Sequence, residues 1–299
     1  MIRKIIYLVN PVSGTKTKHS LQELIIKKTK SKKIDFDIIH SNAKGDYHFL
    51  KEIIHLEKIT DIIICGGDGT VNNVAAALSD VHVNIGIIPS GSGNGLALAA
   101  KIPLQPAKAL EVIFKGKAKF IDGFYINDKF SCMLCGIGFD GLVAHEFAKQ
   151  KKRGLQTYIK VSLANFLKAK PYAFEIKYEN VAFSADAFFI SIANGNQFGN
   201  NFKIAPKASL HDGLLDIVIV KKMNKFMLPF SVLGQVTGMN TMQNRNAISA
   251  TKNIIYFQTP SLTIFNKNNA PLHIDGEPKE TDNFFSIRIV KNAIKLIQP

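Results

Sequence analysis

Apolar runs in the first part of the chain alternate with segments of helical pattern, and each run ends in a loop of small or polar residues. The runs lie at 4–9, 36–40, 62–65 and 84–88, and the helical segments at about 19–30, 46–57, 70–78 and from Leu96 onward. This alternation is typical of a doubly wound parallel sheet with helices on its faces. Because the strand-to-helix loops of such a sheet open at the carboxyl ends of its strands, we expect them to converge on one crevice.

The pattern changes after about Gly123 to short alternating runs with few helices. These runs lie at 129–134, 172–178, 183–193, 214–220, 253–258, 262–265 and 284–290. Many short strands of this kind predict an antiparallel β-sandwich. At 299 residues the chain is also longer than one core usually grows. We therefore predict an α/β domain at 1–123 and an all-β domain at 124–299, whose last residues could pack back on the first domain.

Two helical segments interrupt the second half, one at 142–169 with a break near Gly154 and one at 226–234. The first is basic and amphipathic, with Lys149, Lys151, Lys152, Arg153, Lys160 and Lys168 beside Phe147, Leu155, Tyr158, Leu163 and Phe166. Such a segment can touch a membrane or guard an acyl pocket. It can equally be an ordinary helical cover over the sandwich, and the pattern favours neither interpretation.

The overall charge indicates a polyanionic partner or surface. The chain has 38 Lys and Arg against 23 Asp and Glu, a net charge of +15. The lysines lie in separate segments without interleaved aromatic residues or a recognised nucleic-acid module, so we expect no nucleic-acid partner. We expect peripheral contact with an anionic membrane surface instead, although any one of these clusters could also be a solvated basic surface with no dedicated partner.

The location in the cell is predicted from what the sequence does not contain. No stretch approaches the roughly 20 uninterrupted apolar residues that span a bilayer, and the first residues run directly into a strand. We expect a cytoplasmic protein at the inner membrane face. The three cysteines, Cys65, Cys132 and Cys135, lie in apolar surroundings, and the lone CxxC pair is interpreted as buried structural thiols.

The loop after the run at 62–65 carries the most specific chemistry. It reads Gly66-Gly67-Asp68-Gly69-Thr70-Val71-Asn72 and leads into a helix. Glycines let a backbone approach a bulky anion, and the N–H groups at a helix start favour phosphate. A carboxylate repels a phosphate unless a metal ion lies between them or the carboxylate transfers a proton. The position of Asp68 in this loop therefore indicates phosphoryl chemistry. The competing interpretation is a strand-to-helix turn whose glycines are only steric.

Two further loops follow the same plan. Asn10-Pro11-Val12-Ser13-Gly14 ends the first strand, and Pro89-Ser90-Gly91-Ser92-Gly93-Asn94-Gly95 ends the fourth. Taken alone, the first of these loops marks an ordinary turn. Three such loops in succession, however, predict one cradle large enough for a triphosphate.

The order of these three loops resembles the diacylglycerol kinase catalytic family and its sphingosine kinase relatives, and more remotely NAD kinases and phosphofructokinases. The resemblance implies a phosphofructokinase- and NAD kinase-like first domain that binds ATP with magnesium. Its ATP contacts would be Asn10, Pro11, Val12, Ser13, Gly14, Ser41, Gly66, Gly67, Asp68, Gly69, Thr70, Val71, Asn72 and Ser92. In many members an aspartate follows Gly-Thr-Gly-Asn, whereas Gly95 follows Asn94 here, which is nearer to the sphingosine and ceramide kinase branch.

Ser209-Leu210-His211-Asp212-Gly213-Leu214-Leu215-Asp216 resembles the Asp-Gly-x-Leu-Asp turn of the same family. The resemblance implies a structural magnesium ion bound by Asp212 with the backbones of Ser209 and Leu214. Oxygen ligands of this kind suit a hard cation. Without the resemblance, Asp-Gly would be interpreted as a tight hairpin turn.

His273-Ile274-Asp275-Gly276-Glu277 resembles the terminal Asp-Gly-Glu signature of the family. An alcohol that attacks a phosphate must lose a proton, and a carboxylate within hydrogen-bond reach can accept it. We assign this base to Glu277, with Asp275 orienting it and Asp68 on the magnesium and nucleotide side; Asp68 is also the competing base. The alternative is again a plain hairpin turn between 271–274 and 284–290.

The resemblance, which covers nearly the whole chain, implies an ATP- and magnesium-dependent lipid kinase of phospholipid metabolism, and the basic surface agrees with it. Its substrate would be the hydroxyl of a membrane lipid such as diacylglycerol or a sphingoid base, and an exposed strand edge could pair two copies into a homodimer. A soluble NAD kinase shares the central loop, but Asn72 and Asn73 stand where its acidic residue would be expected. A third possibility is a nucleotide- or nucleic-acid-binding protein without catalysis.

Overall fold

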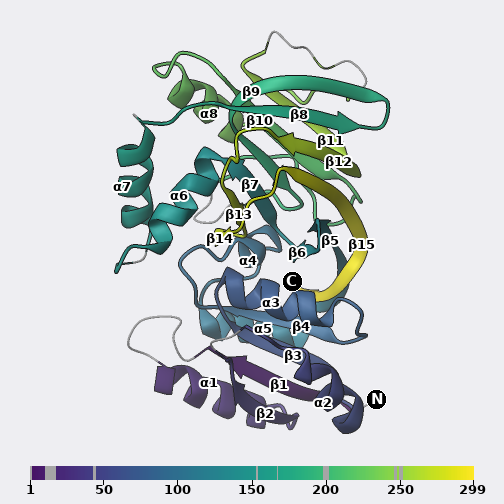
Figure 1. Ribbon diagram of the computed structural model, residues 1–299. Helices are drawn as coiled ribbons and strands as arrows, with labels where there is room; N and C mark the ends of the chain where they lie inside the picture. Colours follow the sequence, from purple (N-terminus) through teal and green to yellow (C-terminus); the bar gives the residue numbers. More distant parts are fainter. Residues whose placement is uncertain are drawn as a thin grey trace. The chain divides into compact units, whose positions relative to one another are not determined.

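The computed structural model describes residues 2–10, 18–42, 45–152, 154–166, 168–197, 202–245, 248 and 252–299. The chain divides into two compact units. Unit 1 comprises Met1–Ile121 together with Asn292–Pro299, and unit 2 comprises Asp122–Lys291. Strands β5 (Lys117–Ile126) and β15 (Phe284–Gln298) each run from one unit into the other (Figure 1).

Unit 1 is a parallel sheet in the order β2-β1-β3-β4-β15, to which β15 contributes only its last residues. The strands are β1 (Lys4–Val9), β2 (Asp35–His40), β3 (Asp61–Gly66) and β4 (Asn84–Pro89). The helices are α1 (Lys18–Ser31), α2 (Phe49–Glu57), α3 (Asp68–Leu78), α4 (Gly95–Ala99) and α5 (Pro106–Lys115). Every residue of β3 is buried, as expected of a central parallel strand of isoleucines. The predicted α/β architecture is confirmed.

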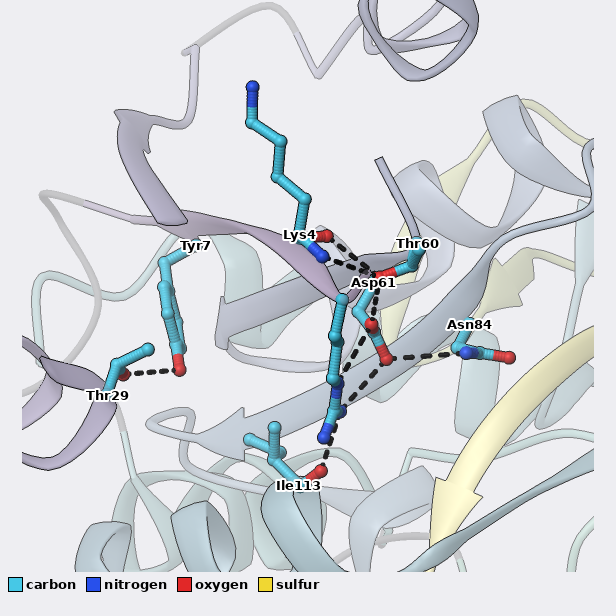
Figure 2. Close-up of polar contacts among 8 residues, drawn as sticks. Lys4, Tyr7, Thr29, Thr60, Asp61, Asn84 and Ile113 are labelled. Carbon is cyan, nitrogen blue, oxygen red and sulfur yellow. Dashed lines mark hydrogen bonds and ion pairs between the residues drawn. The ribbon is translucent and has the colours of Figure 1, made fainter. Parts of the chain in front are cut away.

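A polar network ties the amino ends of these strands together (Figure 2). Arg3 donates from Nε and Nη2 to the two carboxylate oxygens of Asp61, each at 3.0 Å, and from Nη2 to the carbonyl of Ile113 at 2.7 Å. Thr60 and Asn84 donate to the same carboxylate. Because Asp61 is almost fully buried, these donors are what make its charge tolerable there. The network stabilises the sheet edge opposite the strand-to-helix loops.

Unit 2 is built from antiparallel strands in the order β14-β13-β7-β9-β8-β12-β15, with β10 paired to β9 and β11, and β5 to β6 and β15. Its remaining elements are β6 (Lys129–Ser131), β7 (Leu134–Gly138), α6 (Phe139–Ala148), α7 (Leu155–Phe166), β8 (Tyr172–Tyr178), β9 (Val181–Ala193), β10 (Leu215–Lys221), α8 (Leu228–Val236), β11 (Ile254–Thr259), β12 (Ser261–Asn266), β13 (Leu272–Ile274) and β14 (Glu277–Lys279). The predicted β-rich second domain is confirmed.

Strand β10 shows how the core of unit 2 is divided. Its alternate residues Leu215, Ile217 and Ile219 belong to one apolar cluster, and Val218 and Val220 belong to a second. Successive side chains of a strand point to opposite faces, so the buried apolar residues on both faces of β10 require that both faces be covered. Helix α8 covers the second cluster through Leu228 and Val232.

The structure differs from the predicted elements at several boundaries. The predicted helix at 142–169 is two helices, α6 and α7, and Gly154 before α7 has a φ of +113° that ends any continuous helix. The strand expected at 284–290 continues to Gln298, and β5 was not predicted. The hairpin partner of β13 is β14 rather than the segment at 284–290. Within the described residues, no helix combines the length and apolarity needed to cross a membrane.

Candidate functional site

The carboxyl ends of β1, β2, β3 and β4 lie at one edge of the unit 1 sheet. In the strand register Val9 pairs with both His40 and Cys65, and Gly66 pairs with Pro89. Main-chain hydrogen bonds continue this alignment into the loops, from Asn10 N–H to the Cys65 carbonyl at 3.0 Å and from Ser90 N–H to the Gly66 carbonyl at 3.0 Å. The predicted nucleotide residues Asn10, Ser41, 66–72 and Ser92 therefore follow strands that end side by side. Residues 11–14, also predicted to bind ATP, lie outside the described residues.

Side chains connect these loops to one another. Asn10 Nδ2 donates to Thr70 Oγ1 at 2.9 Å, which joins the loop after β1 to the first turn of α3. The Ser41 hydroxyl is hydrogen-bonded to Tyr47, whose pKa is raised by burial and lowered by that bond. Two predicted nucleotide contacts thus already serve to order the loops.

The loops after β3 and β4 approach each other main chain to main chain at Gly67 and Gly91. A Cβ atom on Gly91 would lie 2.5 Å from Cα of Gly67, and one on Gly67 would lie 3.0 Å from Cα of Gly91. Only glycine fits at such a distance, because the neighbour is backbone that cannot rotate away. Asn94 holds the second loop in shape, since its Oδ1 accepts the Gly91 N–H at 2.9 Å and its Nδ2 donates to the Gly91 carbonyl at 2.8 Å.

Asp68 lies at the first position of α3, and its carboxylate accepts the main-chain N–H groups of Asn94, Gly95 and Leu96. It therefore caps the start of α4 from a neighbouring loop. Part of its surface remains exposed, yet the carboxyl lies deep enough for burial to raise its pKa, while the three N–H donors lower it. The capping role was not predicted, and it binds together the two glycine loops. The roles of Asp68 toward magnesium and the nucleotide remain predictions.

This edge of unit 1 fits an ATP triphosphate on two counts. The close approach of Gly67 and Gly91 brings two glycine-rich loops together without intervening side chains, and α3 begins beside Gly67 with the N–H groups of its first turn. Main-chain N–H groups and a helix amino end are favourable surroundings for phosphate.

In unit 2, Asp275 and Gly276 form the two-residue turn between β13 and β14. Their φ angles are +50° and +78°, the pattern of a type I′ hairpin turn, and Ile274 pairs with Glu277 across it. The predicted base Glu277 is thus the first residue of β14. Its side chain is half-exposed, with Oε2 3.3 Å from Nζ of Lys279. A hairpin turn is compatible with a functional carboxylate at Glu277, so the turn geometry excludes neither interpretation.

Asp275 anchors this hairpin to the segment between β6 and β7. Its carboxylate accepts the Ser131 hydroxyl at 3.0 Å and the Leu134 N–H at 3.0 Å, and its own N–H donates to the Leu134 carbonyl at 2.9 Å. These contacts fix the turn that carries Glu277. The arrangement is compatible with the orienting role predicted for Asp275.

A second anchor of the hairpin was missed by the sequence reasoning. The buried His273 of β13 accepts the Gly276 N–H at Nδ1 over 3.2 Å, and its Nε2 lies 3.4 Å from Oδ2 of the buried Asp140 on α6. The available signal was weak: a histidine inside a strand and an aspartate after Gly136-Ile137-Gly138-Phe139.

The same region explains the CxxC pair. Cys132, Cys135 and Cys65 are buried thiols that take part in no disulfide bond. Burial, and then the nearby carboxylates of Asp275 and Asp140, raise the pKa of the Cys135 thiol well above its ordinary value. A thiol held in its neutral form is a poor nucleophile and a poor metal ligand.

The predicted magnesium turn also lies in unit 2. Gly213 has a φ of +69°, the Leu214 N–H donates to Asp212 Oδ1 at 3.1 Å, and the His211 N–H donates to Ser209 Oγ at 3.3 Å. The buried Asp122 accepts the Gly213 N–H at 2.8 Å. Burial first, and then the charge of Asp122, raise the pKa of Asp212.

A cation would offset the burial of the Asp212 carboxylate and the nearby charge of Asp122, so Asp212 suits a hard ion such as Mg²⁺. In the described part of the chain there is no group of three or more His, Cys, Asp or Glu side chains that could hold a metal ion. The predicted ligand set uses a single side chain, Asp212, with the backbones of Ser209 and Leu214. It therefore remains a prediction.

Both units match known protein families. Residues 4–126 match the family model described as diacylglycerol kinase catalytic domain. Residues 134–298 match the model described as YegS C-terminal NAD kinase beta sandwich-like domain. A curated protein of Pectobacterium atrosepticum named "Probable lipid kinase YegS-like" is 32% identical over 268 residues, with 86% of this chain and 85% of that protein covered. A protein of the same name from Yersinia enterocolitica is 32% identical over 249 residues, with 81% and 79% covered.

Solved structures share the fold at lower identity. A crystal structure of a diacylglycerol kinase from Bacillus anthracis strain Sterne aligns with a TM-score of 0.77 at 20% identity, covering 99% of this chain and 97% of that chain. Another solved structure from the same organism aligns with a TM-score of 0.81 at 22% identity and the same coverage. At these identities the likeness describes the fold alone.

Proposed function

Because the chain belongs to the YegS-like lipid kinase family, with a diacylglycerol kinase catalytic domain as its first part, we propose that it transfers the terminal phosphate of ATP to the hydroxyl of a membrane lipid, such as a diacylglycerol or a sphingoid base. The observation that carries this proposal is the set of glycine loops at one edge of unit 1, joined by the Gly67–Gly91 approach. A phosphate-binding edge of this kind is what a kinase requires for its nucleotide.

The residues of unit 1 bind and orient the nucleotide. Asn10, Ser41 and Ser92 offer polar side chains at the edge where the strands end, and the start of α3 offers N–H groups to phosphate oxygens. Bound ATP supplies the phosphoryl group, and magnesium supplies charge neutralisation on its oxygens. Asp68 keeps the two glycine loops together and would help to hold such an ion.

Glu277 in unit 2 accepts the proton of the lipid hydroxyl. As the hydroxyl oxygen forms its bond to the terminal phosphorus, the bond from that phosphorus to the bridging oxygen breaks and ADP leaves with the bond's electrons. The proton passes to Glu277. Asp275 and the Asp275–Gly276 turn hold the carboxylate in place. Asp212 with the Ser209 and Leu214 backbones would hold a separate structural magnesium ion.

An NAD kinase is the second candidate, favoured by the NAD kinase-like description of the family that matches residues 134–298. The two candidates accept different alcohols, a lipid or the adenosine ribose of NAD. Purified protein with radiolabelled ATP is therefore incubated with lipid micelles and, separately, with NAD. Phosphorylation of lipid is the expected result, and phosphorylation of NAD alone would overturn the proposal.

The matched variants for this assay are Glu277→Gln and Glu280→Gln. Both remove one negative charge, but Glu280 is exposed and has no proposed part in the reaction. Loss of a general base lowers kcat by roughly 10²–10⁴-fold, so Glu277→Gln is expected to be severely impaired and Glu280→Gln to be active. Full lipid kinase activity in Glu277→Gln would contradict the assignment of the base.

A further inference from the structure

The outer face of α8 and the turn before it expose large apolar side chains. Phe226 is 85% exposed and Phe230 is 71% exposed. Met227, Leu233 and Met239 are also exposed. Isolated exposed apolar residues are ordinary on a protein surface, but five large ones within fourteen residues are a patch that a partner or a membrane usually covers.

The local structure places this patch on the side of α8 that faces away from the core. Leu228 and Val232 pack on the apolar cluster beneath, and Gln235 is fully buried. Phe230 and Leu233 are three residues apart in α8 and therefore lie on one face of the helix, and Phe226 lies in the turn that precedes it. Asn224 orders the turn before the helix, since its Oδ1 accepts the Phe226 N–H at 2.9 Å. The opposite side of α8 packs on the core, so the exposed patch is held in place by the fold.

The charges beside the patch are basic. Lys221, Lys222 and Lys225 directly precede it, and no Asp or Glu occurs from 217 to 274. On the neighbouring strand β9, Asp186 lies beside this segment, with its carbonyl accepting the Lys222 N–H at 2.7 Å. Three lysines against this one carboxylate leave the surroundings of the apolar patch positive.

We propose that Phe226, Met227, Phe230, Leu233 and Met239, with Lys221, Lys222 and Lys225, form a docking surface for an anionic phospholipid bilayer. Apolar side chains that enter the boundary of the acyl chains, flanked by lysines at the level of the headgroups, are the arrangement of interfacial membrane helices. A second copy of the chain fits this surface less well, because a two-fold contact at α8 would bring the lysines of both copies together.

This surface differs from the amphipathic segment that the sequence suggested. Among the residues of helix α7 whose burial the structure describes, Ile159 and Leu163 are the exposed large apolar residues, and Tyr158 packs against Phe147. The proposed docking surface deepens the lipid kinase function by naming where the enzyme meets its substrate's membrane. Docking itself needs neither ATP nor turnover, so it can be tested apart from catalysis.

The test is sedimentation of the full-length protein with phosphatidylcholine vesicles and with vesicles that also contain phosphatidylglycerol. The wild type is expected to bind the anionic vesicles and to bind the neutral ones weakly. Phe226→Ser combined with Phe230→Ser is expected to lower the partition onto anionic vesicles by about tenfold or more, because it removes two interfacial side chains. Lys222→Gln combined with Lys225→Gln is expected to lower it by several-fold and only on anionic vesicles. The matched control, Ile159→Ser combined with Leu163→Ser on α7, is expected to bind as the wild type does.

Four outcomes would overturn the docking surface. The first is that the wild type does not bind vesicles, and the second is that the Phe226 and Phe230 variant binds as the wild type does. The third is that only the α7 variant loses binding. The fourth is that the wild type is a dimer in analytical ultracentrifugation and the Phe226 and Phe230 variant is a monomer. Circular dichroism and thermal unfolding check that each variant is folded, which is expected for substitutions at exposed positions. Vesicle binding without any lipid phosphorylation would support the surface and contradict the proposed function, so the two can fail separately.

Discussion

Nε2 of His273 lies 3.4 Å from Oδ2 of Asp140, and both side chains are buried. A Cβ atom at Gly136 would lie 1.9 Å from that oxygen and 2.5 Å from that nitrogen, so the pair requires glycine beside it. The other ring nitrogen accepts the Gly276 N–H. Because Nδ1 is an acceptor, the neutral ring carries its proton on Nε2, directed at Asp140. The pair thereby fixes the turn that leads to Glu277.

We predict that two substitutions of His273 have different effects on this turn. In His273→Asn the side-chain oxygen can replace Nδ1 as acceptor, whereas in His273→Gln the amide reaches toward Asp140 and the acceptor is lost. Amide hydrogen exchange at Gly276 is expected to accelerate in the Gln variant more than in the Asn variant, because only the former loses the bond from Gly276. If Glu277 is the base, the variant with the weaker protection of the Gly276 amide from exchange should also have the lower kcat, while its KM for ATP should change little. Equal exchange at Gly276 in both variants would contradict the positioning role of His273.

We predict that Gly91→Ala destabilises unit 1 and weakens ATP binding. The added Cβ would meet Cα of Gly67 at 2.5 Å, so the two loops must separate, at a cost of about 1–3 kcal/mol in unfolding free energy. The measurements are denaturant unfolding and calorimetric titration with ATP. The matched control is Gly234→Ala in α8, where the nearest atoms lie 3.8 Å away. Helix propensity should make this control neutral or more stable by up to about 1 kcal/mol.

We predict that magnesium raises the melting temperature of the wild type and that Asp212→Asn abolishes this effect. An ion that binds only the folded state adds about 1.4 kcal/mol at ten times its Kd, which corresponds to a few degrees. The assay is thermal unfolding with MgCl₂ and with EDTA. Asp128→Asn removes the same charge at an exposed site and should keep the response. A magnesium response that persists in Asp212→Asn would place the ion elsewhere.

We predict that Arg3→Met destabilises the protein by about 2 kcal/mol, because it leaves the buried Asp61 with only Thr60 and Asn84 as side-chain donors. Arg3 itself is partly exposed, which lowers the value below that of a fully buried ion pair. Lys4→Met breaks the neighbouring but exposed pair with Glu57 and should leave stability near that of the wild type. Chemical denaturation of the three proteins measures both effects. If both variants lost the same unfolding free energy, the buried Asp61 network would contribute no more stability than the exposed pair.

The sequence predicts the architecture where a strand's pattern is uninterrupted. The strand at 172–178 is found with the bounds expected, and the glycine loops of unit 1 occur at the predicted strand ends. The pattern fails at β15, where Asn292 takes a φ of +55° and interrupts the alternation in the middle of a continuous strand. Local periodicity cannot show that a strand continues beyond such a residue, because the continuation depends on β4 as its pairing partner.

In the candidate site, too, the local features could be predicted from the sequence and the long-range contacts could not. The Asp-Gly turns and glycine loops are recognisable because their chemistry is local, within a few residues. The pairing of Asp140 with His273 joins residues that are 133 positions apart, and no local pattern at either residue indicates the other. The cap that Asp68 provides for α4 is also non-local, since it depends on two strands being neighbours. Such contacts are set by the register of the sheets and become visible only with the structure.

Strand β15 delivers residues 292–299 to the edge of β4 after all of unit 2 has been traversed. During synthesis the ribosome therefore produces most of unit 1 first, but β4 has no neighbour on that side until 170 intervening residues have been translated. An unpaired, apolar strand edge is prone to capture other chains. The nascent protein is therefore prone to aggregate through the edge of β4 until residues of β15 pair with that strand.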